Sequence, residues 1–409
     1  MDDHVNPDEE TTAGIGQAKR LLDFARGALL ESGGFGYLDM RGGVDPAYPL
    51  ESFITARMTY CFSVGCLMGY PDAPRYAAHG VDALAGMFRD PAHGGYVVSL
   101  ADTAESRRKA AYQHAFVVLA ASAAAAAGVP GGDDLLADVL DVVDRYFWSE
   151  SDAALVEGWD QAFTVREEYW GSNANMHGVE SMLAAYGHTR QPLWRDRATA
   201  IADHFINQRA RHADWLLPEH YAPDWTELRD YNRERPNDEF RPYGVTIGHL
   251  FEWSRLLLEL ASTYDAPPPW LAEAAGHLYD TAVTLGWAAD GAPGFVYTVD
   301  WDGKPVVTQR PHWVVAEAIA AAGTWRRRTG LARYADDLNQ WTDYARRHLH
   351  DPVYGSWHHE LDPSNQPART MWTGKPDVYH ALHAALIPAL PVAESTIRRL
   401  ALTATTDST

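Results

Sequence analysis

The stretch GVTIGHLFEWSRLLLEL, residues 244–260, is apolar on almost every face of the helix that its composition predicts. Three other stretches share this character: ITARMTYCFSVGCLMGY at 54–70, YQHAFVVLAASAAAAAG at 112–128 and HWVVAEAIAAAG at 312–323. A helix that is apolar all round is surrounded by other parts of the protein. These stretches therefore predict a core that is built from several buried helices.

A second kind of helical segment separates the buried ones. WRDRATAIADHFINQRA (194–210) and LARYADDLNQWTDYARRHL (331–349) carry apolar residues at three- and four-residue spacing, which is typical of a helix with one wet face. Amphipathic segments fall near 13–31, 74–89, 132–148, 193–208, 268–287 and 332–349. Buried segments fall near 51–69, 108–127, 172–187, 245–263, 311–328 and 375–388. The two kinds alternate along the chain and make six pairs.

The loops after the amphipathic segments also repeat. Four of them are GGFGYLD at 33–39, DPAHGGYVVSLAD at 90–102, GAPGFVYTVDWDGKP at 291–305 and DPVYGSWHHELDPSNQP at 351–367. Each contains Gly or Pro residues, then an aromatic residue, then a short run of alternating apolar and polar residues that ends at an Asp. This pattern predicts turns with short β-ribbons. Repetition of this kind indicates a repeat architecture.

Six buried helices, each paired with an outer amphipathic helix, predict an all-α fold: an (α/α)6 barrel with short β-ribbons in its loops. An open solenoid is the alternative; it would bind along a concave face, whereas a closed barrel makes one funnel. We expect a single barrel domain over residues 13–395, with flexible tails at 1–12 and 396–409.

The charge balance excludes several classes of partner. The net charge is −21 and no basic stripe occurs, so nucleic acid would be repelled. No Gly-rich phosphate loop occurs either, which disfavours a strongly phosphorylated substrate. The 15 Trp and 20 Tyr offer flat faces with a polar handle, which suit sugar rings and ordinary cores alike.

Neither a disulfide framework nor a membrane segment is indicated. The two cysteines, Cys61 and Cys66, are too few for such a framework or for a zinc site, and we expect them to be buried packing residues. The acidic N-terminus lacks the features of a signal peptide, and no apolar run is long enough to span a bilayer. We therefore expect a cytoplasmic protein.

Polar residues interrupt the buried segments at matching places. They are Arg57, His114, His177, His249, His312 and His380, with a mean spacing of about 65 residues. All inner helices of such a barrel run the same way, so these residues should converge at one mouth, where helix N-termini favour a developing oxyanion. A lone histidine on an apolar helix is more often a hydrogen-bonded core residue, but the repetition favours a site.

Other polar side chains accompany these residues. Those nearest to them in sequence are Lys109, Tyr112, Asn173, Asn175, Glu180, Glu252 and Glu317. Glu252 lies three residues after His249, where it could orient that imidazole, and Glu180 bears the same relation to His177. Salt bridges between inner helices are the alternative role for these carboxylates.

The remaining histidines are weaker candidates. His358 and His359 could line the funnel from a loop. His383 lies one turn beyond His380, so this pair could in principle bind a metal, but no cluster of Asp or Glu ligands accompanies it. We therefore expect neither a metal nor a cofactor.

Histidines, an arginine and aromatic residues in one funnel suit proton abstraction next to a carbonyl. A neutral imidazole can take and return a proton near neutral pH. The resulting enediolate needs hydrogen-bond donors, which Arg57 and the helix ends could supply. No GxSxG elbow or reactive cysteine setting occurs, so covalent acyl chemistry is unsupported.

Five segments resemble the N-acylglucosamine 2-epimerase superfamily, whose fold is an (α/α)6 barrel. They are TARMTY (55–60), KAAYQHAF (109–116), NANMHGVE (173–180), RPYGVTIGHLFEWSRLL (241–257) and WTGKPDVYHALHAALIP (372–388). The resemblance runs from about residue 15 to residue 390 in the same motif order. GHxxEW followed by KPDxYH points to the aldose–ketose isomerase branch, which contains mannose isomerase and sulfoquinovose isomerase.

The resemblance implies roles for individual residues. His249 and His380 would be the acid/base pair, with Glu252 supporting His249, and His177 and Arg57 would contact the substrate. The other expected sugar-binding residues are Tyr112, His114, Asn175, Trp313 and Trp372. Val314 stands where relatives often carry a second tryptophan.

The implied reaction converts D-mannose to D-fructose, and in addition D-lyxose to D-xylulose, through a cis-enediol and without a metal. Sulfoquinovose isomerisation and 2-epimerisation of mannose to glucose on the same scaffold are alternatives. An inverting glycoside hydrolase is a further one and would need two carboxylates across the funnel, drawn from Glu252, Glu317, Glu360 and Asp377. A barrel that binds sugar without catalysing a reaction is the last alternative.

Overall fold

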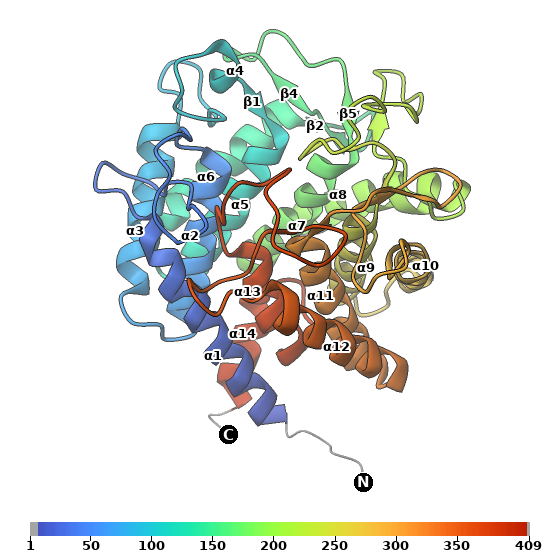
Figure 1. Cartoon of the computed structure of the whole chain (residues 1–409). Helices are drawn as coiled ribbons and strands as arrows, with labels where there is room; N and C mark the ends of the chain where they lie inside the picture. Colours follow the sequence, from blue (N-terminus) through green and yellow to red (C-terminus); the bar gives the residue numbers. More distant parts are fainter. Residues whose placement is uncertain (1–6, 407–409) are drawn as a thin grey trace.

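The computed structural model of the protein describes residues 7–406. Six helices form its inner ring (Figure 1). Their bounds are α2 (Ser52–Leu67), α5 (Ala111–Ala126), α7 (Ser172–Thr189), α9 (Ile247–Ala261), α11 (His312–Thr329) and α13 (Tyr379–Leu386). Each inner helix packs against the next, and α13 packs against α2, which closes the ring. The predicted (α/α)6 barrel is confirmed, and the open solenoid is excluded.

Six outer helices surround this ring. They are α1 (Pro7–Ala25), α3 (Ala73–Ala83), α6 (Gly132–Val142), α8 (Pro192–Ala202), α10 (Pro269–Gly286) and α12 (Ala332–Tyr344). Four of them continue into a π-helical segment, namely η2 (Leu84–Phe88), η3 (Val143–Phe147), η4 (Asp203–Ala210) and η5 (Ala345–Leu349). The extended helices match the amphipathic segments that the periodicity predicts.

The inner helices are buried along almost their whole length because they face the core on one side and outer helices on the other. In α5, 14 of the 16 residues are buried, and most of them are alanine, valine or leucine. Small side chains let backbones approach closely. A Cβ added at Gly323 of α11 would lie 2.6 Å from Cα of Pro388. Cys61 is buried and Cys66 is partly buried, as expected of packing residues.

Short antiparallel ribbons join the loops at the end of the barrel where the inner helices begin. The pairs are β1 (Lys109–Ala110) with β4 (Gly158–Trp159), β2 (Trp148–Ser149) with β3 (Ala154–Leu155), β5 (Trp170–Gly171) with β6 (His220–Tyr221), and β10 (Arg310–Pro311) with β11 (Glu360–Leu361). A three-stranded sheet contains β7 (Val245–Thr246), β8 (Thr298–Val299) and β9 (Pro305–Val307). The short helix α4 (Ala104–Arg107) lies in a loop of the same end. The predicted β-ribbons are therefore present.

The ribbons that include a strand before an inner helix follow one rule. The strand that precedes an inner helix pairs with the loop that follows the next outer helix, and the first N–H of the inner helix donates to a carbonyl of that loop. The accepting carbonyls belong to Val98 for α2, Glu157 for α5, Glu219 for α7, Tyr297 for α9 and His359 for α11, at 2.9–3.1 Å. No side chain caps these helices within the described chain, so the loop carbonyl satisfies a donor that would otherwise be free. The loops are thereby fixed over the mouth.

The expectation of flexible tails is wrong where the structure describes them. Residues Thr396–Thr406 form helix α14, which packs against α2 and α7, and its Arg399 is fully buried. At the other end α1 already begins at Pro7, and Glu10 forms ion pairs with Arg326 and Arg327. Residues 1–6 and 407–409 lie outside the described part.

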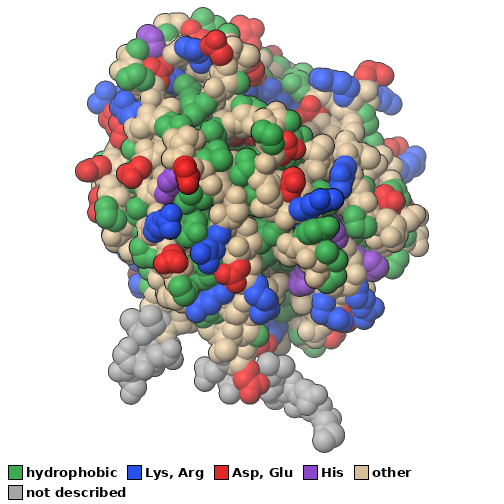
Figure 2. Space-filling model, turned by 60° about the vertical axis from the view of Figure 1, so that its left-hand side comes forward, with side chains coloured by type: hydrophobic (Ala, Val, Ile, Leu, Met, Phe, Trp, Pro, Cys, Tyr) green, Lys and Arg blue, Asp and Glu red, His purple; other side chains and the backbone are tan. Residues whose placement is uncertain are grey.

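The surface carries both signs of charge. Figure 2 shows one face of the molecule, on which acidic and basic side chains are interspersed. Among residues 7–406, no helix combines the length and the apolar character that crossing a membrane requires.

Candidate active site

A cavity with about 900 Å³ of empty space, part of it open to solvent, lies at the mouth where the inner helices begin. Every inner helix, or the loop just before it, contributes a side chain to its wall. They include Phe53 and Arg57 of α2, Tyr112 of α5, Asn173 and His177 of α7, His249 and Glu252 of α9, His312 and Trp313 of α11, and Asp377 and His380 at α13. The convergence that the repeat spacing predicts is therefore present for five of the six residues, and His114 is the exception.

His380 and His249 each have a buried carboxylate behind the ring. Nδ1 of His380 lies 2.9 Å from Oε1 of Glu317, and Nδ1 of His249 lies 2.8 Å from both oxygens of Glu219. An ionised carboxylate only accepts hydrogen bonds, so Nδ1 carries the proton in each ring. Nε2, on the other side of each ring, is then turned toward the cavity that both residues line.

Trp313 stands between these two imidazoles. Its ring centroid lies 5.2 Å from that of His249 and 5.8 Å from that of His380. Gly248 makes room for the indole, because a Cβ there would lie 2.1 Å from the six-membered ring. The arrangement fixes two proton-accepting groups on either side of one flat apolar surface, which suits a sugar ring.

Two of the cavity imidazoles are neutral near pH 7. Burial, followed by the charges of Arg57 and His312, lowers the pKa of His380 well below its ordinary value. Burial also lowers the pKa of His177, although the carboxylate of Glu180 opposes this effect. Neutral imidazoles can accept a proton, which a general base must do.

Arg57 places a fixed positive charge in the cavity wall. Nη1 donates to Oδ2 of Asp377 at 3.0 Å, and Nη2 donates to the hydroxyl of Tyr112 at 2.9 Å. Its guanidinium also lies over the rings of Phe116 and Tyr379, 4.4 and 5.0 Å from the centroids. Burial alone would lower the pKa of Arg57, but the neighbouring Tyr112 and Asp377 raise it, so the group stays charged. It can stabilise an oxyanion formed beside it.

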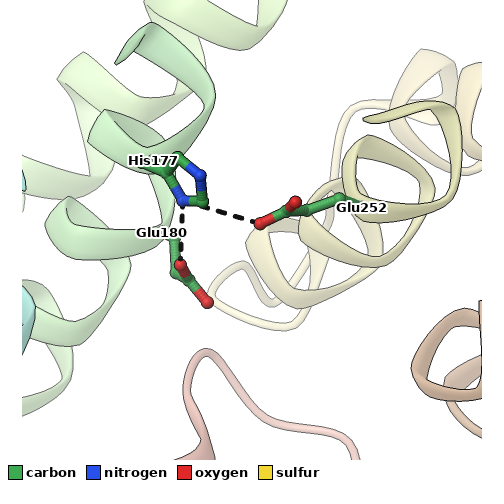
Figure 3. A group of neighbouring side chains, drawn as sticks. All are labelled: His177, Glu180 and Glu252. Carbon is green, nitrogen blue, oxygen red and sulfur yellow. Dashed lines mark hydrogen bonds and ion pairs between the residues drawn. The ribbon is translucent and has the colours of Figure 1, made fainter. Parts of the chain in front are cut away.

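Glu252 does not support His249, contrary to the sequence-based expectation. Glu219, in the loop before β6, takes that place, while Oε1 of Glu252 lies 3.6 Å from Nδ1 of His177 (Figure 3). Burial and then the charges of Glu317 and Glu180 raise the pKa of Glu252 well above its ordinary value. Both effects favour the protonated form of Glu252. The spacing of three residues on one helix does not bring it to His249.

His177, Glu180 and Glu252 form the one group of possible metal ligands found among the described residues, with ligand atoms within 4.8 Å of one another (Figure 3). A cation is already in contact with both carboxylates, because Arg255 Nη2 lies 3.4 Å from Glu180 and 3.6 Å from Glu252. The hydroxyl of Tyr379 also donates to Glu180. A metal would have to displace these partners. His383 forms no pair with His380, since its Nε2 contacts the hydroxyl of Tyr60 at 2.8 Å.

Two residues expected to bind sugar lie outside the cavity. His114 has Nδ1 2.8 Å from the carbonyl of Ala110, and its Nε2 accepts from the N–H of Tyr96 at 3.0 Å. Asn175 exchanges hydrogen bonds with both backbone groups of Leu155, and its amide also donates to the carbonyl of Gly171. Both side chains are fully buried and fully engaged with backbone. Their expected role in binding is therefore wrong.

Helix register explains this outcome. Counted from the first helical residue, His114 and Asn175 are the fourth residues of α5 and α7, whereas His177 is the sixth residue of α7 and Arg57 the sixth of α2. Two residues along a helix rotate a side chain by about 200°. The sixth position faces the barrel axis, where α5 has Phe116, 4.7 Å from the ring of His177. The fourth position faces the loops outside.

The rim of the cavity comes from loops. Nε1 of Trp372 donates to Oε1 of Glu239 at 2.6 Å, and the ring of Tyr37 stacks on Tyr48 at 3.9 Å. His359 lines the cavity and stacks on His312 at 3.7 Å, whereas His358 points toward Asp351. Burial raises the pKa of both Glu51 and Glu239 to about 7, and the charge of Glu239 adds to the effect on Glu51.

The sequence reasoning missed Glu219 and the rim residues Glu51, Glu239, Tyr37 and Tyr48. For Glu219 a signal exists, because it occupies the same repeat position as His359: both carbonyls accept the first N–H of an inner helix. The loop around Glu219 lacks the Gly-rich pattern of the four loops that reveal the repeat, so alignment by composition omits it. Glu239 and Tyr48 lie in loops without a repeat pattern, and nothing in the sequence marks them.

Of the four carboxylates that a hydrolase could use, all but Glu252 are engaged. Glu317 bonds to His380 and Arg255, and Asp377 bonds to Arg57. Glu360 accepts from the backbone N–H groups of residues 370, 371 and 372, which shapes the loop. These groups therefore position other residues.

Comparisons with known proteins agree with this architecture. The family model of N-acylglucosamine 2-epimerase (GlcNAc 2-epimerase) matches residues 33–384. A D-mannose isomerase of Thermobifida fusca is 46% identical over 388 residues, which are 94% of this chain and 95% of that protein. A D-mannose isomerase of Pseudomonas cannabina pv. alisalensis is 42% identical over 383 residues, 93% of this chain and 92% of that protein.

A solved structure is also similar. The crystal structure of a D-mannose isomerase superposes with a TM-score of 0.85 at 26% sequence identity, covering 92% of this chain and 97% of that one. The family model and the relatives each span most of the chain, and the (α/α)6 ring with its six-helix mouth is present in full. The chain therefore belongs to the N-acylglucosamine 2-epimerase family.

Proposed function

We propose that this chain is an aldose–ketose isomerase that interconverts D-mannose and D-fructose by transferring a proton between C2 and C1. One observation carries the proposal: two imidazoles face one cavity, and each has its Nδ1 proton held by a buried carboxylate. The D-mannose isomerases at 46% and 42% identity support the choice of substrate. A site of this kind can move protons without a nucleophile or a redox group.

The reaction begins with opening of the sugar ring, in which His249 assists by moving the proton between the ring oxygen and O1. Nε2 of His380 then removes the proton from C2, the electrons of that bond form the C1–C2 double bond, and the π electrons of the C1 carbonyl move to O1, which gives a cis-enediolate. His249 passes the proton of O2 to O1, and His380 returns its proton to C1. The net change moves one hydrogen from C2 to C1 and one from O2 to O1.

Arg57 stabilises the charge that builds on the sugar oxygens during this transfer. Its guanidinium is fixed by Asp377 and Tyr112, so it needs little reorganisation when an oxyanion forms. The N-terminal ends of the inner helices add a positive potential at the same place. His177, whose Nδ1 faces Glu180 and Glu252, offers Nε2 to a substrate hydroxyl.

The charges around the cavity favour a neutral sugar over a sulfonated one. Arg57 is the only Lys or Arg among the described residues that line it, and Asp377 already neutralises this cation. Glu51 and Glu239 stand at the rim, where they would repel an anion. D-mannose, and with it D-lyxose, fits this pattern better than sulfoquinovose.

Isomerisation is favoured over two other reactions. A hydrolase would need two free carboxylates, whereas Glu317, Glu360 and Asp377 are all engaged. A 2-epimerase uses the same enediol but needs a second base on the opposite face of C2. The identity to D-mannose isomerases supports return of the proton to C1.

The test is incubation of the purified chain with D-mannose in D2O, followed by NMR. D-fructose is the expected product, and the deuterium found at its C1 measures how often the proton on His380 exchanges with solvent before it is returned. D-glucose would show epimerisation instead, exchange at C2 alone would show an enediol without product, and no change would contradict the proposal. D-lyxose should yield D-xylulose in the same assay.

The proposed reaction needs no metal, because imidazoles and a guanidinium supply all of its proton transfers and charge stabilisation. Turnover should therefore survive dialysis against EDTA. A loss of activity that Mn²⁺ or Zn²⁺ restores would point instead to the group of His177, Glu180 and Glu252 as a metal site.

A further inference from the structure

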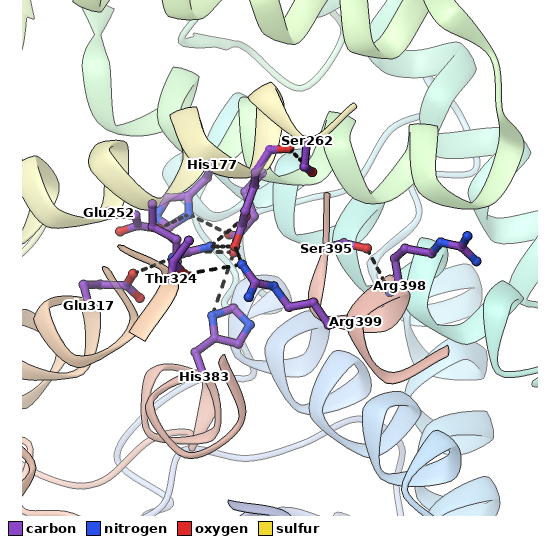
Figure 4. A network of polar contacts seen from close by, with 12 residues as sticks. His177, Glu252, Ser262, Glu317, Thr324, His383, Ser395, Arg398 and Arg399 are labelled. Carbon is purple, nitrogen blue, oxygen red and sulfur yellow. Dashed lines mark hydrogen bonds and ion pairs between the residues drawn. The ribbon is translucent and has the colours of Figure 1, made fainter. Parts of the chain in front are cut away.

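A continuous line of buried charged groups runs from Arg399 of the C-terminal helix to His380. Figure 4 shows part of this network, with Arg399 and Glu317 labelled. Nη2 of Arg399 lies 2.9 Å from Oε1 of Glu259, whose Oε2 lies 3.1 Å from Nη1 of Arg255. Nε of Arg255 lies 3.1 Å from Oε2 of Glu317, whose Oε1 lies 2.9 Å from Nδ1 of His380. Each carboxylate bridges two neighbours, so the line has no gap.

The line brings together parts of the chain that are far apart in the sequence. Arg399 belongs to α14, Glu259 and Arg255 to α9, Glu317 to α11 and His380 to α13. All five residues are at most 5% exposed. Charges in such surroundings interact strongly because little water screens them.

Other charged and polar groups contact the two ends of this line, His380 at one end and Arg399 at the other. His380 is surrounded by Arg57 of α2, His177 of α7, His312 of α11 and Asp377 of the loop before α13. Arg399 lies near the cations Arg255 and Arg327, and it also donates to the carbonyl of Pro391 and the hydroxyl of Thr324. Glu259 is therefore the anion that Arg399 neutralises.

We propose that Arg399 is a positioning residue for the reaction and sets the proton affinity of His380 through Glu259, Arg255 and Glu317. This inference rests on the proposed function, in which His380 is the base. The C-terminal helix thereby takes part in catalysis although it does not touch the cavity.

The mechanism is a competition for Arg255 between Glu259 and Glu317, while Nη2 of Arg255 keeps its contacts with Glu180 at 3.4 Å and Glu252 at 3.6 Å. With Arg399 present, Glu259 is shared between two cations, and Arg255 neutralises Glu317 more fully. Without Arg399, Glu259 draws Arg255 to itself, Glu317 becomes more negative, and the protonated form of His380 is stabilised. Removal of Glu259 acts in the opposite direction, because both arginines then lack that anion.

The experiment compares Arg399→Met, Glu259→Gln and the double variant, with Arg399→Lys as the conservative replacement. The readout is the acid limb of kcat/KM for D-mannose against pH, which reports the base of the free enzyme. We expect the limb to move up by about 0.5 pH unit or more in Arg399→Met and down in Glu259→Gln. The double variant and Arg399→Lys should return it toward that of the unchanged protein.

Arg327→Met is the matched control, since it removes a cation near Arg399 that lies outside the line. Its limb should stay in place. Thermal melting of each variant separates a lower stability from a shifted limb. A folded Arg399→Met protein with an unshifted limb, or single variants that shift it in the same direction, would overturn the proposal.

NMR titration of the His380 ring, assigned by comparison with His380→Asn, reads the same shift without turnover. If the chain failed to isomerise D-mannose but the titration moved in opposite directions in the two single variants, the proposed function would fail and the charge coupling would stand. If turnover occurred and the titration did not move, the coupling alone would fail.

Discussion

His114 on α5 and His177 on α7 occupy neighbouring inner helices and are both almost fully buried, yet they face different parts of the molecule. Both ring nitrogens of His114 are engaged by backbone groups of Ala110 and Tyr96. Only Nδ1 of His177 is engaged, by the carboxylates of Glu180 and Glu252, and its other nitrogen faces the cavity. The partners of a buried imidazole thus decide whether it can exchange a proton with a ligand.

The same contrast extends to the histidines proposed as acid and base. His380 and His249 each have a carboxylate on one nitrogen, as His177 does, and a cavity on the other side. The outward-facing side of the mouth holds the loops together, whereas the inward-facing side is the one to which we assign the chemistry. Substitutions on the two sides should therefore have separable effects on activity and stability.

The largest expected effect is the loss of the base. His380→Asn should lower kcat/KM for D-mannose by a factor of about 10² to 10⁴, the range that general base catalysis contributes. His114→Asn is its counterpart on the outward side. It should keep kcat/KM within about threefold and lower the free energy of unfolding by about 1–3 kcal/mol, because it breaks backbone hydrogen bonds.

Steady-state kinetics and urea unfolding of both variants measure these effects. A His380→Asn protein with near-normal turnover would remove that residue from the mechanism. An equally large loss of turnover in a stable His114→Asn protein would end the distinction between the two sides.

The next largest effect concerns the carboxylates behind the bases. Glu317→Gln and Glu219→Gln each leave a neutral amide beside Nδ1, which no longer fixes the tautomer or stabilises the imidazolium. We expect kcat to fall by about 10- to 100-fold in each variant, with little change in KM.

Glu360→Gln is a matched control for these two variants, since Glu360 is a buried carboxylate bonded to loop N–H groups and not to a histidine. Its effect should fall mainly on stability. A larger loss of kcat in Glu360→Gln than in Glu317→Gln would contradict the assignment of Glu317.

The inward-facing side could be predicted in large part from the sequence. Arg57, Tyr112, His177, His249, Trp313, Trp372 and His380 all line the cavity. Hydrophobic periodicity specifies the inner helices, and a repeat spacing near 65 residues puts polar residues at similar heights. The position of a residue along the barrel axis does not determine the direction in which its side chain points. A shift of two residues in helix register is therefore enough to turn His114 and Asn175 outward.

The partners of the site residues were harder to predict because they come from other elements. Glu219 reaches His249 from a loop 30 residues away, and Arg399 reaches Glu259 from α14, 140 residues away. The segment of α14 is rich in threonine, which has a low helix propensity, so it reads as a tail. Its helix is stabilised by tertiary contacts, such as the buried ion pair of Arg399, that local sequence does not reveal.

A smaller effect is expected from pH. The pKa of His380 lies well below its ordinary value of 6.5, so kcat/KM should stay level as the pH falls through 6.5. Stability behaves differently. Burial lowers the pKa of His114 to about 3 and that of His312 to about 4, so these groups bind protons more readily in the unfolded chain. Their stabilising effect is complete above 6.5 and is lost as the pH falls toward those values.

Melting temperatures and kcat/KM measured from pH 8 to pH 4.5 test this separation. We expect the melting temperature to fall below pH 6.5 while kcat/KM is still on its plateau, and His114→Asn should make that fall shallower. An activity that halves at pH 6.5 would indicate a base with an ordinary pKa and contradict the burial of His380.

The smallest effect is expected at the rim of the cavity, whose residues come from loops and belong neither to the inward-facing nor to the outward-facing side of the inner helices. The pKa of Glu239 is raised to about 7, so this group is mostly protonated at pH 6 and mostly charged at pH 8. A raised carboxyl pKa stabilises the fold below the ordinary value of 4.5, and this contribution is lost as the pH rises through 7. Glu239→Gln should therefore change kcat/KM by less than about threefold at pH 6 and flatten the decline of the melting temperature toward pH 8.

Trp372 supplies the check on this argument, because its Nε1 donates to Glu239 and a glutamine can still accept that bond. Glu239→Gln then removes the charge and keeps the contact, whereas Trp372→Phe removes the contact and keeps the charge. If the charge at the rim matters, Glu239→Gln should also weaken the discrimination against a C6-phosphorylated mannose, and Trp372→Phe should not. Equal discrimination in both variants would locate the preference for neutral sugars deeper in the cavity, beside Asp377 and Arg57.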